Sequence, residues 1–309
     1  MGGTPRHLDH VGFAEGVPGA LLAGIHPGAA SDERHDLAVD PFIALGHVGH
    51  PTKAQRYRAQ PRLASVSSSK RKSRTQGPVL RRQDQIQPTT HDQRLLAKGG
   101  SSDWVHSDPW RVMRIQSEFV EGFGTLSELG PAISVFGSAR TKPGTPEYKA
   151  GVEIGRKIVE AGYAAITGGG PGIMEAVNKG AARAGGVSVG LGIELPFESS
   201  LNKYVTLGIN FRYFFARKVM FLKYSQGFIV MPGGYGTFDE VFESLTMMQT
   251  KKVTSFPLVL VGTKYWGGLI DWMRESVLAD GYINPIDLDM LKITDDPDEA
   301  VRLVTNPSD

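Results

Sequence analysis

The sequence contains no cysteine and no long apolar run, and each absence removes a class of protein. Without cysteine the chain cannot form disulfides, use a thiolate nucleophile or build a zinc ribbon, which fits a reducing compartment. No apolar stretch approaches the roughly 18 residues that a membrane-spanning helix needs. The stretch at positions 17–25 is short and interrupted by proline and glycine, so it is a poor signal peptide. We therefore expect a cytoplasmic protein without a membrane partner.

Bulky apolar residues are scarce in the first hundred positions, where Phe13, Phe42 and Tyr57 are the only aromatic residues. A segment so poor in large apolar groups cannot offset the entropy lost on ordering. The sequence thus predicts a mostly disordered tail over residues 1–95. A helical extension over 96–130 and one folded domain over 131–305 follow. We expect a chain that lacks the tail to keep its activity.

Charge is uneven along the chain. Residues 1–100 hold 14 Lys and Arg against 8 Asp and Glu, whereas residues 101–309 hold 20 against 24. The basic patch at 70–74 with Arg81 and Arg82 is more typical of a solvated tail than of a nucleic-acid or membrane site. Because the histidines of the tail are scattered without ligand spacing, we expect no metal.

Apolar runs and amphipathic stretches alternate after residue 131. Strands are expected at 132–137, 163–167, 187–193, 227–231, 257–261 and 291–294. Helices are expected at 108–129, 147–161, 172–184, 211–224, 237–250, 266–280 and 297–304. Near-continuous apolar strands separated by helices indicate a parallel sheet covered on both faces. The predicted fold class is α/β, a Rossmann-like doubly wound parallel sheet with an N-terminal helical extension and a disordered tail.

A glycine-rich turn at residues 232–240, Pro-Gly-Gly-Tyr-Gly-Thr-Phe-Asp-Glu, joins one of these strands to a helix. Gly233, Gly234 and Gly236 lack side chains, so the backbone can take positive φ and approach a ligand, while the first N–H groups of the helix point at an anion. Thr237 adds a hydroxyl donor. Glu240 places a carboxylate one turn into the helix, where it suits neutral ribose hydroxyls better than phosphate. The turn predicts a nucleotide site.

Two further loops follow strands that end at the same sheet edge. Gly137-Ser138-Ala139-Arg140 follows the first strand, and the run Gly168 to Glu175 follows the second. Ligands of such sheets lie beyond the carboxyl ends of the strands, so three converging loops favour a ligand that carries phosphate. The loops fit neither a dinucleotide fingerprint nor a P-loop, because the glycine spacing is wrong and the chain has no Gly-Lys pair.

The pairing of Gly168-Gly169-Gly170-Pro171-Gly172-Ile173-Met174 with the turn at 232–240 resembles the LOG (LONELY GUY) family, whose members are often labelled lysine decarboxylases. The resemblance covers about 130–304. It implies a Rossmann-like fold, a homodimer or larger assembly of dimers, and hydrolysis of cytokinin riboside 5′-monophosphates or AMP to free base and ribose 5-phosphate. It also implies functional roles for Arg217 and Glu240, and no cofactor. The domain at 131–305 is then a nucleotide-binding catalytic domain.

The chemistry also argues for Glu240, because a carboxylate can hold ribose hydroxyls, stabilise an oxocarbenium-like transition state or orient water. Arg217 lies among apolar helix residues, and it either contacts phosphate or base or makes a structural ion pair. Its neighbour Lys218 is about 100° around the helix, so we expect it at solvent or at a subunit contact. For Glu175, contact with the substrate and a structural role are balanced. Ser138 either hydrogen-bonds the ligand or permits a tight turn, and it is a weaker candidate than Glu240 and Arg217.

A loop contact to the phosphate or ribose is also expected from Gly169 and Gly170.

Lysine decarboxylation has little support, because neither central glycine loop contains a lysine that could hold pyridoxal phosphate. The alternative from another class is a nucleotide sensor that binds without cleaving. The helix at 237–250 is apolar around more of its circumference than one sheet contact requires, which favours a homodimer or higher homo-oligomer.

Overall fold

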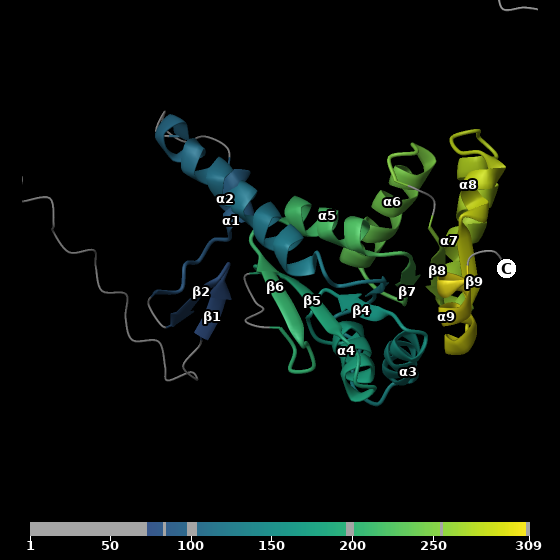
Figure 1. The fold of residues 1–309 in the computed structure, drawn as a ribbon. Helices are drawn as coiled ribbons and strands as arrows, with labels where there is room; N and C mark the ends of the chain where they lie inside the picture. The colour runs from purple at the N-terminus through teal and green to yellow at the C-terminus, as the bar shows by residue number, and fades with distance from the viewer. Residues whose placement is uncertain (1–72, 83–84, 98–103, 196–200, 254–255, 307–309) are drawn as a thin grey trace, which may run out of the picture. The chain divides into compact units, whose positions relative to one another are not determined.

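The computed structural model describes residues 73–82, 85–97, 104–195, 201–253 and 256–306. Within these ranges a seven-stranded sheet has the order β6-β5-β4-β3-β7-β8-β9, and every neighbouring pair is parallel (Figure 1). The strands are β3 (Ala132–Phe136), β4 (Ala164–Thr167), β5 (Ser188–Ile193), β6 (Leu207–Phe211), β7 (Phe228–Val230), β8 (Leu258–Val261) and β9 (Leu291–Thr294). This arrangement confirms the predicted doubly wound α/β fold.

Helices connect the strands and cover both faces of the sheet. They are α1 (His91–Leu95), α2 (Trp104–Leu126), α3 (Pro146–Glu160), α4 (Ile173–Arg183), α5 (Phe214–Tyr224), α6 (Tyr235–Gln249), α7 (Thr263–Trp272), the π-helix η3 (Met273–Leu278), α8 (Pro285–Asp289) and α9 (Pro297–Thr305). Local signals set several starts. The Thr145 hydroxyl accepts a hydrogen bond from the N–H of Tyr148 at 3.3 Å ahead of α3, and Pro146 fits the first turn.

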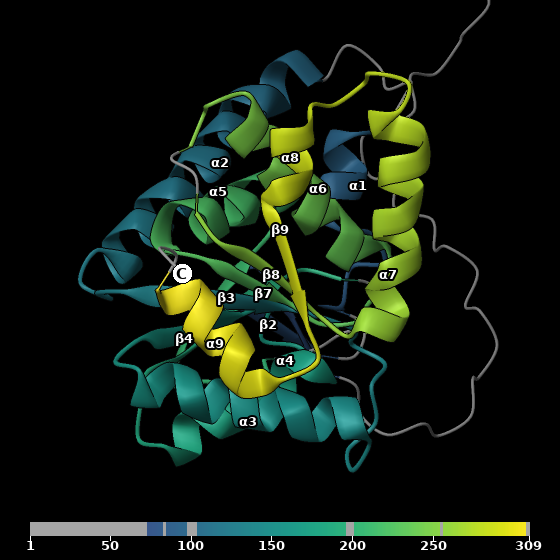
Figure 2. The ribbon, with the colours of Figure 1, turned by 90° about the vertical axis from the view of Figure 1, so that its right-hand side faces the viewer.

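The core consists of two apolar layers, one on each face of the sheet. Successive strand residues point to opposite faces, so Ile229 packs with α3, α4 and α9 while Phe228 and Val230 pack with α2, α5, α6 and α7. Figure 2 shows α3, α4 and α9 on one side of the sheet and α5, α6 and α7 on the other. Both layers exclude water, which stabilises the sheet that carries the loops.

The winding direction reverses between β3 and β7, which are neighbours in the sheet although three strands separate them in chain order. From β3 the chain proceeds outward through β4 and β5 to β6, then returns to β7 on the other side. A crevice opens beyond the carboxyl ends of the strands at such a reversal. The loops that follow β3 and β7 are the predicted loops at 137–140 and 232–240.

Part of the predicted tail is ordered. The antiparallel hairpin of β1 (Ser73–Gln76) and β2 (Val79–Arg82) and the short helix α1 lie within residues 73–95. The Nδ1 of His91 lies 2.6 Å from Oε2 of Glu194, and Gln76 donates to Oε1 of the same carboxylate at 3.2 Å. Asp92 accepts a hydrogen bond from the N–H of Phe214, the first residue of α5, at 3.2 Å.

The prediction of disorder is therefore wrong for these elements, and removal of residues 73–95 would remove contacts to the domain. Composition misled the prediction because the segment is held largely by polar partners about a hundred positions away, with Leu95 packed against the core. Residues 1–72 lie outside the described residues. For them the disordered tail and its basic patch at 70–72 stay predictions.

Two other elements differ from the sequence-based expectation. The helix predicted at 211–224 is α5, which begins only at Phe214, and Phe211 instead ends the edge strand β6, which was not predicted. An edge strand needs less continuous apolar character, and Leu207–Phe211 contains a glycine and an asparagine. The helix predicted at 108–129 is α2, so Pro109 lies inside the helix rather than at its start.

His91→Ala should destabilise the protein, because the Glu194 side chain is 0% exposed and loses a partner at 2.6 Å. Weakening the hydrogen bonding of a buried charged group costs about 1 to 3 kcal/mol. His91→Gln keeps a donor and should lose less. Chemical denaturation at neutral pH measures both free energies of unfolding, and equal values for His91→Ala and the unmodified chain would contradict the prediction.

Candidate active site

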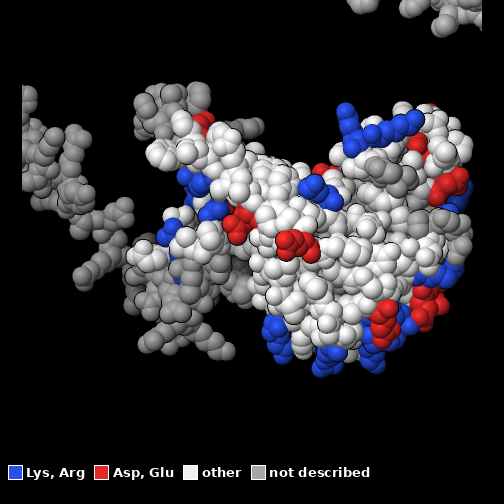
Figure 3. Space-filling model, viewed as in Figure 1, with Lys and Arg blue, Asp and Glu red and all other residues white. Residues whose placement is uncertain are grey.

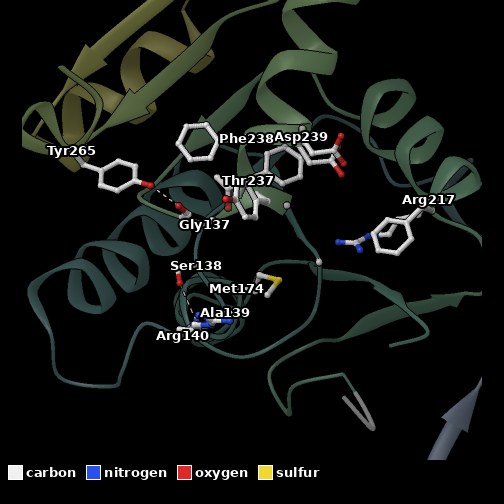
Figure 4. Close-up of a pocket in the computed structure, with 18 residues that line it drawn as sticks. Gly137, Ser138, Ala139, Arg140, Met174, Arg217, Thr237, Phe238, Asp239 and Tyr265 are labelled. Carbon is white, nitrogen blue, oxygen red and sulfur yellow. Dashed lines mark hydrogen bonds between the residues drawn. The ribbon is translucent and has the colours of Figure 1, made fainter. Parts of the chain in front are cut away.

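A cavity of about 620 Å³ lies where the loops after β3 and β7 meet (Figure 4). Its walls come from the β3 loop, the start of α4, α5, the β7 loop with the start of α6, and α7. The lining residues are Phe136, Gly137, Ser138, Ala139, Arg140, Gly168, Met174, Phe214, Arg217, Gly233, Gly234, Tyr235, Gly236, Thr237, Phe238, Asp239, Glu240 and Tyr265. The structure thus brings together parts of all three predicted loops.

The first turn of α6 provides backbone donors to this cavity. Its N-cap is Gly234, which has no side chain to satisfy the first N–H groups of the helix. The Gly234 carbonyl accepts from the N–H of Thr237 at 2.9 Å and of Phe238 at 3.1 Å. Both Gly234 and Gly236 face open space, since a Cβ built on either meets no atom within 4 Å. An anion can therefore approach the backbone at the positive end of the helix dipole.

Positive φ occurs in a different loop from the one expected. Gly234 has a φ of −103°, and neither Gly233 nor Gly236 has positive φ. Positive φ falls instead on Gly169 at +70° and Gly172 at +71°. The turn at 232–236 needs glycine for open space and close packing, because a Cβ on Gly233 would lie 2.0 Å from the Thr237 hydroxyl oxygen. The prediction of positive φ at 233–236 was therefore wrong.

The β3 loop is tied to both neighbouring loops through Ser138. Its N–H donates to the Pro232 carbonyl at 3.0 Å, and its carbonyl accepts from the N–H of Ile173 at 3.0 Å. Its hydroxyl accepts from the N–H of Arg140 at 3.0 Å, which keeps the turn closed (Figure 4). Gly172 permits the approach, because a Cβ there would lie 2.2 Å from the Ser138 carbonyl oxygen. Ser138 lines the cavity, and its contact with a substrate stays a prediction.

The triple-glycine loop presents one of its glycines to the cavity. Gly168 lines it beside Arg217, whereas Gly169 and Gly170 are outside the lining set and accept hydrogen bonds from Asn202. Asn202 also donates to the buried Asn178 at 2.9 Å. Buried polar networks of this kind hold a loop in one conformation. Gly169 and Gly170 therefore support the loop in this structure, and their contact with phosphate or ribose stays a prediction.

Glu175 is likewise outside the lining set. It lies in the first turn of α4, where a carboxylate is favoured by the helix dipole, and Tyr148 donates to its Oε1 at 3.3 Å. Its neighbour Met174 does line the cavity. These contacts favour the structural alternative for Glu175.

Glu240 and Arg217 both line the cavity, and the charge of Arg217 acts on the Glu240 carboxyl. Glu240 is 7% exposed, and burial raises the pKa of its carboxyl to about 7. The positive charges of Lys218 and Arg217 lower that pKa but do not cancel the effect of burial. The Arg217 guanidinium lies 5.2 Å from the ring centroid of Phe221 and 6.0 Å from that of Phe214. Figure 4 places it across the cavity from Tyr265. The site therefore holds a carboxyl that titrates near neutrality beside a fixed positive charge.

Lys218 does not face solvent, which was one of the two positions expected from the sequence, and the other position, a subunit contact, stays a prediction. Its side chain is 15% exposed and pairs with Asp239 at 2.8 Å and with Glu243 at 2.6 Å. The Lys218 side chain, 100° around α5 from Arg217, faces α6 rather than solvent, because α6 lies beside α5. Lys218 thus pairs with acidic residues of α6, and the positive charge of Arg217 lowers the pKa of Glu240.

Comparison with known proteins identifies the family. A family model described as "Possible lysine decarboxylase" matches residues 174–304. The cytokinin riboside 5′-monophosphate phosphoribohydrolase of Mycobacterium tuberculosis is 31% identical over 155 residues, which cover 48% of this chain and 81% of that protein. The chain belongs to the LOG family. The probable cytokinin riboside 5′-monophosphate phosphoribohydrolase LOGL5 of Oryza sativa subsp. japonica is 31% identical over 144 residues, 44% of this chain and 56% of that protein.

A solved structure with a similar fold is the molybdenum cofactor binding protein of Rippkaea orientalis. It is 23% identical, with a TM-score of 0.44, and the alignment covers 58% of this chain and 98% of that one.

The LOG site includes residues that the sequence did not single out. Phe214 and Phe238 supply aromatic walls, and Tyr265 closes one end by donating its hydroxyl to the Gly233 carbonyl. Nothing in the sequence marks Tyr265, because it lies beyond the next strand.

Within the described ranges no group of three or more His, Asp or Glu side chains is placed to hold a metal. Among the helices of the same ranges, none combines the length and the apolar character that a membrane span requires.

Two alanine substitutions in the LOG turn should have different effects. Gly236→Ala adds a methyl group into open space, so the fold should keep its melting temperature while phosphate affinity falls about tenfold, or about 1.4 kcal/mol. Gly233→Ala forces the methyl group against Thr237 and should lower both stability and affinity. Calorimetry of unfolding and of inorganic phosphate binding separates the two. Unchanged affinity in Gly236→Ala would place the ligand elsewhere.

Proposed function

We propose that this protein hydrolyses the N-glycosidic bond of nucleoside 5′-monophosphates, namely cytokinin riboside 5′-monophosphate or AMP, to free base and ribose 5-phosphate. Its curated LOG relatives are named phosphoribohydrolases, so the chain is an N-glycosidic bond hydrolase. One observation carries the choice of substrate class. The buried carboxyl of Glu240 lies in the same cavity as the exposed backbone amides at the start of α6.

The phosphate occupies the N-terminal end of α6 in this proposal. Gly236 and Thr237 line the cavity there, and Ser138 lies on the adjoining loop. Because the N–H groups of Thr237 and Phe238 donate to the Gly234 carbonyl, we assign the phosphate to those of Tyr235 and Gly236. Negative charge is favoured at a helix N-terminus because the peptide dipoles point that way. The 5′-phosphate thus fixes one end of the nucleotide.

Glu240 acts on the ribose, one turn along the same helix. Breaking the N-glycosidic bond develops positive charge on the sugar, and a carboxylate stabilises that charge or orients the attacking water. A pKa of about 7 leaves a large share of Glu240 ionised at neutral pH, and the share grows as the pH rises. We therefore assign to the ionised form the stabilisation of the oxocarbenium-like transition state.

Arg217 contacts the departing base or its electron-rich edge. Its guanidinium lines the cavity on the Glu240 side, with the Phe214 ring 6.0 Å away, so an aromatic base has an apolar wall and a cation within reach. Decarboxylation of an amino acid fits less well. Among the described residues that line the cavity there is no lysine to hold pyridoxal phosphate, and Lys218 is engaged by Asp239 and Glu243.

Incubation of the full chain with AMP and with isopentenyladenosine 5′-monophosphate tests the proposal. Release of ribose 5-phosphate and free base from either nucleotide supports it. Nucleotide binding without release would contradict hydrolysis and favour the non-catalytic sensor. Absence of both binding and release would contradict a nucleotide site altogether.

We also propose that the protein forms a homodimer through α5 and α6. Phe215 and Val219 on α5 and Phe242 on α6 are 40%, 38% and 39% exposed, which is unusual for three large apolar side chains on neighbouring helices. Figure 3 shows charged side chains on the visible face along its lower and right-hand edges, with fewer on the central surface.

Val219→Asp should convert the dimer to single chains, because a charge buried between two helices is strongly unfavourable. Light scattering after gel filtration measures the mass of both proteins, and circular dichroism confirms that the variant is folded. A single-chain mass for the unmodified protein would contradict the dimer.

A further inference from the structure

Lys218 reaches from α5 to three carboxylates on the first three turns of α6. Its Nζ lies 2.8 Å from Oδ2 of Asp239, 2.6 Å from Oε2 of Glu243 and 3.8 Å from Oε1 of Glu240. The first two distances are those of charge-assisted hydrogen bonds. The third is longer than a hydrogen bond but within strong electrostatic range. The ammonium group is therefore held by two outer acids and directed at the central one.

The Lys218 ammonium group offsets the repulsion within the acidic cluster of Asp239, Glu240 and Glu243. Asp239 and Glu243 are four positions apart on α6, so their carboxylates project on the same side of the helix and repel each other. Glu240 is the most buried of the three, with a side chain 9% exposed against 53% for Asp239 and 33% for Glu243. Each neighbouring anion opposes ionisation of Glu240, and a cation at 3.8 Å favours it.

We propose that Lys218 is a positioning residue that sets the protonation state of Glu240, with Asp239 and Glu243 holding its ammonium group in place. The catalytic importance of this setting rests on the hydrolase function proposed above. Lys218 is outside the set of residues that line the cavity, so its role is separable from substrate contact. Arg217, by contrast, lines the cavity.

Four charged groups thus face Glu240 from the two helices packed around it. Arg217 and Lys218 on α5 lower the pKa of its carboxyl, whereas Asp239 and Glu243 on α6 raise it, and burial raises it most. The arrangement explains how a nearly buried carboxyl can still ionise near neutral pH. It also leaves the Glu240 oxygens available to a substrate, because the Lys218 ammonium bonds to Asp239 and Glu243 instead.

The pH dependence of hydrolysis by Lys218→Met tests the inference. Loss of a cation at this distance should move the acidic limb of kcat/KM upward by about 1 to 3 pH units, with activity restored at alkaline pH. Lys218→Arg keeps the charge and should restore a near-normal profile. Lys223→Met removes an exposed charge from the same helix and should leave the limb in place. An unmoved limb in Lys218→Met would overturn the inference.

A titration that needs no catalysis distinguishes this failure from failure of the proposed function. Carbon-13 NMR of glutamate carboxyl groups, assigned by Glu240→Gln, follows the ionisation of Glu240 directly in the full chain. Lys218→Met should raise its titration midpoint, and Lys218→Arg, which keeps the charge, should leave it nearly unchanged. Lys218→Gln, which removes the charge but keeps a polar group, should raise the midpoint too and supplies the test if Lys218→Met fails to fold. Midpoints that do not move in these directions would overturn the inference even if the protein hydrolyses AMP.

Discussion

Glu240→Gln should lower turnover of nucleoside 5′-monophosphates by about two to three orders of magnitude, the usual effect of removing a group that stabilises transition-state charge. Binding should fall only modestly, because the backbone amides at Gly234 and Gly236 and the hydroxyl of Thr237 stay in place. Glutamine fills nearly the same volume but cannot carry the negative charge. Steady-state assays at pH 8, where Glu240 is largely ionised, measure the loss in kcat.

Glu275→Gln is the matched control. Glu275 is exposed on η3, outside the set of cavity-lining residues, and undergoes the same chemical change. Its kcat should equal that of the unmodified chain. Equal kcat for Glu240→Gln and Glu275→Gln would show that the ionised Glu240 has no role in the chemical step.

Glu240→Gln should also stabilise the fold at alkaline pH. Folding raises the pKa of Glu240 from an ordinary value of 4.5 to about 7, so the folded chain binds more protons than the unfolded chain between these values. The stability of the unmodified protein due to this group is therefore complete below about pH 4.5, falls as the pH rises toward 7, and is lost above it. Glutamine, like the protonated acid, avoids that loss.

The expected gain is about 3 kcal/mol above pH 7 and near zero at pH 4.5, from the energy equivalent of the raised pKa. Urea denaturation at pH 5 and at pH 8 measures the difference. Glu275→Gln should gain nothing at either pH. A gain for Glu240→Gln that does not grow with pH would contradict the assigned pKa. A gain that grows with pH would show that the ionised Glu240 carboxyl lowers the stability of the fold.

Much of the fold could be predicted because apolar runs and glycine turns are local signals. The prediction of a strand at 227–231 corresponds to β7, and the turn after it leads into α6 as expected. The strand β6 was missed because its residues, Leu-Gly-Ile-Asn-Phe, show little pattern and its place at the sheet edge is decided by pairing with β5. Long-range partners also decided that α1 is ordered, because its His91 contacts Glu194.

The candidate site was predicted loop by loop but not contact by contact. The sequence indicated the three loops, and the structure places their residues around one cavity. It did not indicate Tyr265, which arrives from α7, or the hydrogen bonds that turn Gly169 and Gly170 toward Asn202. The position of Lys218 on its own helix does not show the acids that α6 presents to it.

By itself, the order of residues determined that this chain forms a parallel sheet with glycine turns at its carboxyl edge, because hydrophobic period and backbone freedom depend on near neighbours. Only the tertiary structure decided which charges surround Glu240, since burial and Coulomb interactions depend on distances between α5 and α6 that no local pattern encodes. A carboxyl that titrates near pH 7 is therefore a property of the packed helices and not of the Gly-Gly-Tyr-Gly-Thr turn that precedes it.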